Sequence, residues 1–185
     1  MTGVRNRKEM HMYIRKAEEA DIPFISDIYE RIHSDEESGK VTIGWVRGIY
    51  PTRATAESAL QRGDLFVGAD GEKIVASAII NQVQMDSYAM GNWSEETPEK
   101  EIMVLHTLVI DPDCARRGFG REFVRFYEEY AEKNACTMLR MDTQEMNVNA
   151  RKLYQKLGYT EVGIVPCSFN GIADIRLVLL EKKIK

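Results

Sequence analysis

Cysteines are scarce in this sequence, and their positions exclude two kinds of scaffold. Cys114, Cys136 and Cys167 are the only three in 185 residues; they lie far apart, and none forms a CxxC pair. A disulfide framework uses an even set of cysteines, and a structural zinc site uses closely spaced ligand pairs. We therefore expect neither a disulfide framework nor a metal site, and we expect the protein to work in the reducing cytoplasm.

Long apolar runs and an excess of positive charge are missing as well. No segment approaches the roughly 18 apolar residues of a membrane helix, and the opening MTGVRNRKEMHMYIRK has no signal-peptide core. The formal net charge of −4 argues against a protein that binds nucleic acid by neutralising phosphates, although it is compatible with cationic substrates. We expect neither a membrane nor a nucleic-acid partner.

Internal repeats, low-complexity tracts and Gly/Ser linkers are also absent. Hydrophobic residues make up 44% of the chain and charged residues 29%, a composition typical of globular proteins, and this length suits one domain with a substantial core. We expect residues 1–11 to form a flexible N-terminal tail and residues 12–185 to form a single domain.

The spacing of apolar residues predicts seven strands and four helices. The strands are expected at 12–17, 64–70, 73–84, 101–110, 136–142, 159–165 and 173–182, and the helices at 21–32, 52–63, 119–130 and 147–158. This order predicts an α/β (α+β) fold with a mixed, mainly antiparallel sheet of about seven strands flanked by about four helices. Strands 101–110 and 136–142 should be parallel neighbours, because a helix connects them.

Four local signals support these boundaries. Asp21 precedes a helical pattern as a candidate N-cap. Gly63 and Gly158 stand just after helical patterns, where glycine commonly ends a helix. The pair Asp70-Gly71 predicts a tight hairpin between two strands.

The segment DPDCARRGFGREF, at residues 111–123, combines glycines with arginines where a strand gives way to a helix. The first amides of a helix have no partner within the helix and lie at the positive end of its dipole, where an anion is favoured. Gly118 and Gly120 would let an anion approach the backbone, while Arg116, Arg117 and Arg121 would add positive charge. The plainer alternative is a tight turn with solvated arginines.

Two other phosphate-binding motifs fit this segment less well. A dinucleotide-binding turn would use GxGxxG, with Asp142 as its ribose-binding acid, but Phe123 replaces the third glycine. Residues 111–117 also separate the strand from Gly118, whereas that turn is tight. A P-loop would require Gly-Lys-Ser/Thr, which does not follow.

The segment LVIDPDCARRGFGREFV resembles motif A of the GNAT superfamily of acetyl-CoA-dependent N-acetyltransferases, in which Gln/Arg-x-x-Gly-x-Gly/Ala opens a helix. About thirty residues later, NVNARKLYQKLGYTEVG is similar to the family's next motif. That second match consists of Asn147, Ala150, Leu153, Tyr154, Gly158 and Tyr159. The resemblance covers nearly all of residues 12–182 and implies a GNAT-like fold. One departure is Ala115, which occupies the usual Gln/Arg position.

The resemblance implies acetyl-CoA as cosubstrate, an amine as acceptor, and a site that holds both, with a homodimer left open. The pyrophosphate would lie on the amides of residues 116–121, and the pantetheine arm would bond to the backbone of the 104–110 strand. The residues implied in cofactor binding are Leu108, Val109, Ile110, Arg116, Arg117, Gly118, Phe119, Gly120, Arg121 and Asn147.

Acyl transfer to an amine requires a base for the amine, a donor to the oxyanion and an acid for the leaving thiolate. Tyr154 fits the acid and its family position, although it could also be a core tyrosine. We interpret His106 as the base, because an imidazole titrates near neutrality; a buried structural histidine, Asp142 and Glu145 remain alternatives. The amide of Leu108 is the candidate oxyanion donor.

Acceptor recognition is expected from segments 34–50, 84–99 and 165–172. They combine acids with aromatic side chains that could hold a cationic amine, namely Trp45, Tyr50, Tyr88 and Trp93. The favoured function is transfer of the acetyl group of acetyl-CoA to a primary amine of a small molecule or peptide, by direct attack in a ternary complex. The alternative is a non-catalytic acetyl-CoA sensor or interaction module of the same fold.

Overall fold

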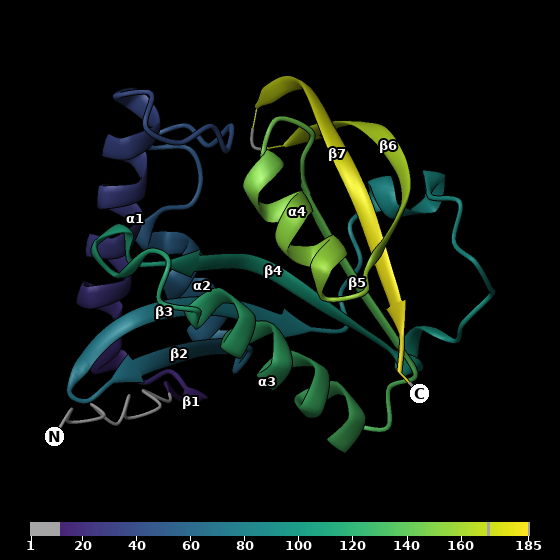
Figure 1. Cartoon of the computed structure of the whole chain (residues 1–185), viewed down its shortest axis with the longest axis horizontal. Helices are drawn as coiled ribbons and strands as arrows, with labels where there is room; N and C mark the ends of the chain where they lie inside the picture. The colour runs from purple at the N-terminus through teal and green to yellow at the C-terminus, as the bar shows by residue number, and fades with distance from the viewer. Residues whose placement is uncertain (1–11, 170, 185) are drawn as a thin grey trace, which may run out of the picture.

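A computed structural model describes residues 12–169 and 171–184, so the tail predicted at residues 1–11 lies outside the described part of the chain. The described residues contain one seven-stranded sheet in the order β1-β2-β3-β4-β5-β7-β6 (Figure 1). Its strands are β1 (Tyr13–Lys16), β2 (Leu65–Asp70), β3 (Lys73–Asn81), β4 (Ile102–Ile110), β5 (Met138–Gln144), β6 (Thr160–Phe169) and β7 (Ile172–Lys183). Only β4 and β5 run parallel. The predicted mixed, mainly antiparallel sheet is confirmed.

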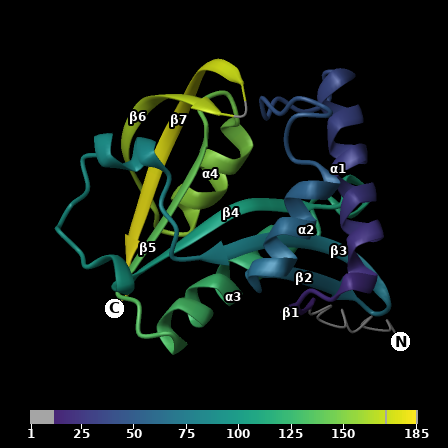
Figure 2. The same cartoon turned by 180° about the vertical axis from the view of Figure 1, so that it is seen from behind.

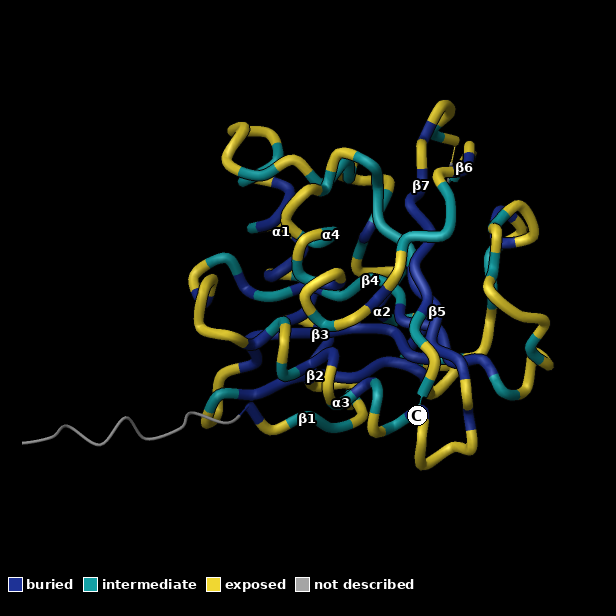
Figure 3. Tube along the Cα trace, turned by 45° about the vertical axis from the view of Figure 1, so that its right-hand side comes forward, coloured by how far each residue is buried: buried dark blue, intermediate teal, exposed yellow. Residues whose placement is uncertain are grey.

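In the described part of the chain, four α-helices cover the two faces of this sheet, as the apolar spacing predicted. They are α1 (Ile22–Glu37), α2 (Arg53–Arg62), α3 (Phe119–Lys133) and α4 (Val148–Lys156). Helices α1 and α2 pack on one face around a core that includes Ile25 and Ile28, and they lie in front in Figure 2. Helix α3 packs on the other face through Phe123 and Tyr127, both fully buried. Figure 3 shows the middle strands buried and the connecting loops exposed.

The local signals predicted the ends of the helices correctly, but the side-chain cap expected of Asp21 was wrong. Gly63 ends α2 in the left-handed conformation, with φ +76°. Asp21 stands at the N-cap of α1, but its side chain does not cap that helix. Its carboxylate instead accepts from the amide of Glu18 and from the guanidinium of Arg15 at 2.7 Å. Arg15 competes for the oxygen atoms, so Asp21 joins β1 to the turn before α1.

The feature that positions the site is a fork between the two parallel strands. Pairing of β4 with β5 ends at Leu105 and Met141, and the strands then separate, as Figure 1 shows. Pairing of β4 with β3 continues, but β4 carries one extra residue between His106 and Val109. Within this bulge Thr107 has φ +50°, a conformation that non-glycine residues seldom adopt. An edge of β4 is therefore left unpaired in the middle of the sheet.

Among the described residues, no helix is both long and apolar enough to cross a membrane. The same part of the chain contains no group of three or more histidine, cysteine or acidic side chains that could hold a metal ion. The three cysteines are all unpaired.

Candidate functional site

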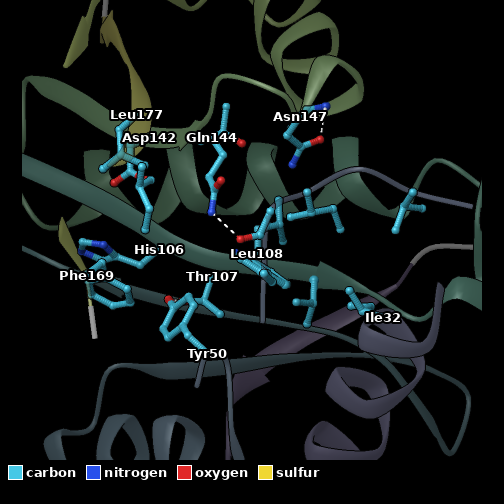
Figure 4. Close-up of a pocket in the computed structure, with 18 of the residues that line it drawn as sticks. Ile32, Tyr50, His106, Thr107, Leu108, Asp142, Gln144, Asn147, Phe169 and Leu177 are labelled. Carbon is cyan, nitrogen blue, oxygen red and sulfur yellow. Dashed lines mark hydrogen bonds between the residues drawn. The ribbon is translucent and has the colours of Figure 1, made fainter. Parts of the chain in front are cut away.

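A cavity of about 330 Å³ lies in the fork between β4 and β5. Figure 4 shows side chains from separate parts of the chain around it. Its lining residues from β4, β5 and α4 are His106, Thr107, Leu108, Val109, Ile110, Asp142, Thr143, Gln144, Asn147, Ala150 and Tyr154. The cavity thus brings together the sequence-predicted acid, the predicted base and the predicted cofactor strand.

The predicted anion site lies where α3 begins. Gly118 is the N-cap of α3 with φ +91°, and nothing lies within 4 Å of where its Cβ would be. No acceptor within the described residues is recorded for the amides of Gly118, Phe119 and Gly120. Asp111, which is fully buried, anchors the preceding loop through contacts with Arg31 and Lys73. The helix start therefore presents open amides on a fixed loop.

Gly118 has open space where a side chain would be, whereas Gly120 is surrounded by packed side chains. A Cβ at Gly120 would stand 3.3 Å from Leu153 Cδ2 and 3.9 Å from Ile110 Cγ1. It would therefore point into the contact between α3, α4 and the end of β4. Glycine at this position permits close packing of α3, α4 and the end of β4, and a larger residue would disturb that packing.

The three predicted arginines are not equivalent. Arg116 and Arg121 are exposed. Arg117 pairs with Asp70 at 2.7 Å, and its guanidinium lies 4.7 Å from the ring centroid of Phe119. Phe119 itself is buried in the core beneath α3. The positive charge of Arg117 is already partly balanced within the protein.

Asn147 is the N-cap of α4, and its Oδ1 accepts from the amide of Ala150 at 3.2 Å. The side-chain oxygen is therefore used to start the helix. Asn147 also lines the cavity (Figure 4), which leaves its Nδ2 as the group that can face a ligand.

Tyr154 is both a core residue and a cavity residue. Its side chain belongs to the core beneath α3 and makes an edge contact with Tyr159, with ring centroids 6.1 Å apart. It also lines the cavity, and no hydrogen bond from its hydroxyl to another described residue is recorded. Burial, and then the charge of Asp142, raise the pKa of Tyr154, so its phenol stays protonated.

His106 stands at the apex of the fork with its tautomer set by two neighbours. Its Nε2 lies 3.1 Å from both Asn81 Oδ1 and the carbonyl of Val83. Asn81 Oδ1 also accepts from the Val83 amide, so both partners of the imidazole are acceptors and Nε2 carries the proton. Burial lowers the pKa of His106 to about 4, well below the near-neutral value on which the sequence interpretation relied.

Asp142 occupies the matching position at the fork, directly after the last residue of β5 that pairs with β4. Its Oδ2 accepts from the hydroxyl of Tyr88 at 2.8 Å. Burial raises the pKa of Asp142 to about 6, although the bond from Tyr88 opposes this shift. Glu145, the other acid considered from sequence, pairs with Arg176 at 2.6 Å and does not line the cavity.

The predicted acceptor segments contribute unequally. Trp45 and Tyr50 line the cavity, but Met85 is the only lining residue from segment 84–99. Tyr88 is buried behind Asp142 and supports it, and Trp93 donates to the Tyr88 carbonyl at 2.7 Å. These two aromatics were expected among the acceptor-facing residues and instead support the site from behind. Aromatic composition alone does not distinguish a lining ring from a supporting one.

A loop contact across the cavity had no signal in the sequence. Gln144 Nε2 donates to the carbonyl of Gly44 at 2.7 Å (Figure 4), which joins the end of β5 to the segment after α1. Glu36 accepts from the amides of Ile43 and Gly44 and holds that segment to α1. Tyr50 adds a bond from its hydroxyl to Thr107 in the β4 bulge.

Comparison with known proteins gives both sequence and structural matches. A curated relative, an uncharacterized N-acetyltransferase of Methanocaldococcus jannaschii, is 28% identical over 74 residues, which is 40% of this chain and 33% of that protein. The match thus spans only a third of the relative's length. The solved structure of a GNAT family acetyltransferase from Streptococcus agalactiae has a TM-score of 0.79 and 22% identity, covering 94% of this chain and 96% of that one.

A putative acetyltransferase from Salmonella typhimurium, solved with its cofactor acetyl-CoA, has a TM-score of 0.64 and 17% identity, covering 94% of each chain. At these identities the structural likenesses show the fold. The family itself is shown by a model of the acetyltransferase (GNAT) family that matches residues 22–159, which include both sequence motifs and the fork. The chain belongs to the GNAT family of acetyltransferases.

Proposed function

We propose that the protein transfers the acetyl group of acetyl-CoA to a primary amine, by direct attack of the amine within a ternary complex. The observation that carries the proposal is the fork, where one cavity contacts an unpaired strand edge, the Tyr154 phenol and the Asp142 carboxylate. Family membership supports acetyl transfer, and the acetyl-CoA in the Salmonella typhimurium structure supports the choice of cosubstrate.

Acetyl-CoA would run from the start of α3 along β4 to the fork. The open amides from Gly118 to Gly120 would receive the pyrophosphate at the positive end of the α3 dipole. Exposed Arg116 and Arg121 would add attraction. The pantetheine amides would pair with the free edge of β4 between Leu108 and Ile110, as another strand would. The Nδ2 of Asn147 would then reach the same arm from α4.

In the reaction, the amine nitrogen bonds to the thioester carbonyl carbon, the carbonyl oxygen becomes negative, and the carbon–sulfur bond then breaks. The Leu108 amide would donate to the oxyanion. Tyr154 would give its proton to the departing thiolate, a role open to a phenol that lines the cavity and remains protonated. The amine proton would pass to His106 or to Asp142.

The choice between these two bases depends on their surroundings. With Nε2 protonated, only Nδ1 of His106 has a lone pair for a proton, and its low pKa makes it a weak acceptor. Asp142 has a pKa nearer the working pH, which suits a general base better. We keep His106 as the base predicted from sequence and rank Asp142 beside it.

The experiment that tests the proposal is incubation with acetyl-CoA and a panel of amines, followed by mass spectrometry of the products. A product 42 Da heavier than its amine and formation of free CoA are expected, because one acetyl group replaces one hydrogen. Acetyl-CoA should also raise the melting temperature, whereas NAD and ATP should not. An acetyl-CoA shift without turnover of any amine would favour the sensor alternative. The cytoplasmic location and the homodimer remain predictions.

A further inference from the structure

We infer that the acceptor is a primary amine with one positive charge and a compact apolar body, bound with its ammonium group at Asp142. This inference rests on the proposed function and adds the chemical class of the acceptor. It excludes amino acids, whose carboxylate is negative, and diamines, whose second end is positive. The evidence is the distribution of charge and apolar surface within the cavity.

Among the described residues that line the cavity, Asp142 and Asp35 are the two acids, and Asp142 is the one at the fork. No lysine or arginine is among the described residues that line the cavity. The second lining carboxylate, Asp35, belongs to α1 and pairs with exposed Lys40 at 2.9 Å. A cation at the fork therefore meets one unpaired carboxylate, and a substrate carboxylate in the cavity meets no cationic side chain. An ion buried without a partner is strongly disfavoured.

The orientation of Asp142 suits an ammonium group. Tyr88 donates to Oδ2 from behind, so the carboxylate is held in place while Oδ1 remains available. Tyr88 is 2% exposed and is itself held through its carbonyl by Trp93. Asp142 and Tyr154, the proposed acid, line the same cavity, so an amine bound at this carboxylate would lie close to the thioester.

Apart from polar Thr107, Thr143 and Gln144, the lining around the acceptor space is mainly apolar and aromatic. Tyr50 contacts Phe169 edge-on at 4.7 Å between ring centroids and Trp45 at 6.0 Å. The hydroxyl of Tyr50 is already bonded to Thr107, so the ring and not the polar tip is available to a ligand. Met85, Ile172, Ile175 and Leu177 add further apolar lining. An alkyl or aryl group gains free energy by burial here, whereas a second charge would lose its hydration.

The size of the cavity argues in the same direction. Its volume of about 330 Å³ is at the small end of the range for ligand pockets. The bond from Gln144 to Gly44 closes the space on one side, and the thioester end of the cosubstrate must share it. A large polar amine such as an aminoglycoside does not fit these limits.

Matched pairs of amines test the inference directly. Hexylamine and 1,5-diaminopentane have the same number of heavy atoms and differ by a terminal methyl against a second ammonium. Phenethylamine and phenylalanine differ by one carboxylate. We expect kcat/KM to be about 10²-fold higher for the first member of each pair, the order of discrimination that an unpaired charge produces in an apolar site. Diaminopentane or phenylalanine within tenfold of its partner would overturn the inference.

A variant pair locates the charge that does the binding. Asp142→Asn should lower kcat/KM for phenethylamine about 10²-fold while the Kd of acetyl-CoA stays within about threefold. Its melting temperature at pH 7.5 should not fall, because Asn can still accept from Tyr88 and a buried charge is removed. Glu145→Gln is the matched control and should change neither constant, because Glu145 lies outside the cavity. An equal loss in both variants would contradict the role of Asp142.

Calorimetry with the CoA complex separates this inference from the proposed function. Phenethylamine should bind the CoA-loaded protein, and Asp142→Asn should weaken that binding. If binding follows this pattern and no acetylated product forms, the acceptor class holds and the proposed catalysis fails. If product forms but 1,5-diaminopentane and phenylalanine, which carry a second charge, are the preferred substrates, catalysis holds and the acceptor class is wrong.

Discussion

The two ends of the cavity are built from different parts of the chain and in different ways. Apart from Asn147, the proposed cofactor end comes from one continuous segment, residues 108–121, and offers mainly backbone amides. The acceptor end combines side chains from segments 35–50, 142–144 and 167–177, which are distant in sequence. A pantetheine arm and a pyrophosphate can be held by generic backbone groups, whereas an acceptor must be distinguished by side chains. Substitutions should therefore act differently at the two ends.

The largest effect is expected at Tyr154. Tyr154→Phe removes one oxygen and keeps the ring, so its core contact with Tyr159 should survive. If the phenol protonates the thiolate, turnover should fall roughly 10²-fold, or about 3 kcal/mol of transition-state stabilisation. The Kd of acetyl-CoA should move far less. Single-turnover kinetics, with chemistry rate-limiting, give the comparison, and wild-type turnover would make Tyr154 a core residue only.

A loss of 10- to 10²-fold is expected when the base is removed, and the pH profile identifies which residue it is. A base must be unprotonated, so kcat/KM rises with pH through its pKa. The rise should lie near pH 6 for Asp142 and near pH 4 for His106. If Asp142 is the base, Asp142→Asn should abolish the rise of kcat/KM near pH 6; if His106 is the base, His106→Gln should abolish the rise near pH 4. A profile unchanged in both variants would assign the proton to water.

The smallest effect is expected at the cofactor end. Gly118→Ala forces a side chain into φ +91°, at about 1–2 kcal/mol of strain, and should weaken acetyl-CoA binding about tenfold by shifting the amides. Gly63→Ala is the matched control: it imposes similar strain at φ +76° on the end of α2, away from the cavity. Melting curves and titration of acetyl-CoA should show comparable destabilisation but an altered Kd only for Gly118→Ala. If Gly118→Ala and Gly63→Ala had the same Kd for acetyl-CoA, binding by the amides at the start of α3 would be contradicted.

The same contrast separates what could be predicted from what could not. The order of elements was predicted correctly because apolar spacing is a local signal, and the parallel pair β4 and β5 followed from the helix that connects them. The prediction that the Asp21 side chain caps α1 was wrong, because Arg15 from another element binds its carboxylate. Tyr88 and Trp93, which were expected to face the acceptor, lie behind Asp142 instead, because the identity of an aromatic residue does not show which way its ring faces.

By itself the sequence determined the fold, the family motifs and the start of α3. The last is readable from sequence because the free amides at a helix N-terminus attract an anion whatever the surrounding fold. Only the tertiary structure decided the chemistry of the fork. The burial of His106 and Asp142 moves their pKa values in opposite directions, and the bulge at Thr107 opens the strand edge between them. Burial and strand separation depend on contacts between residues far apart in the chain, and those contacts exist only once the sheet has formed.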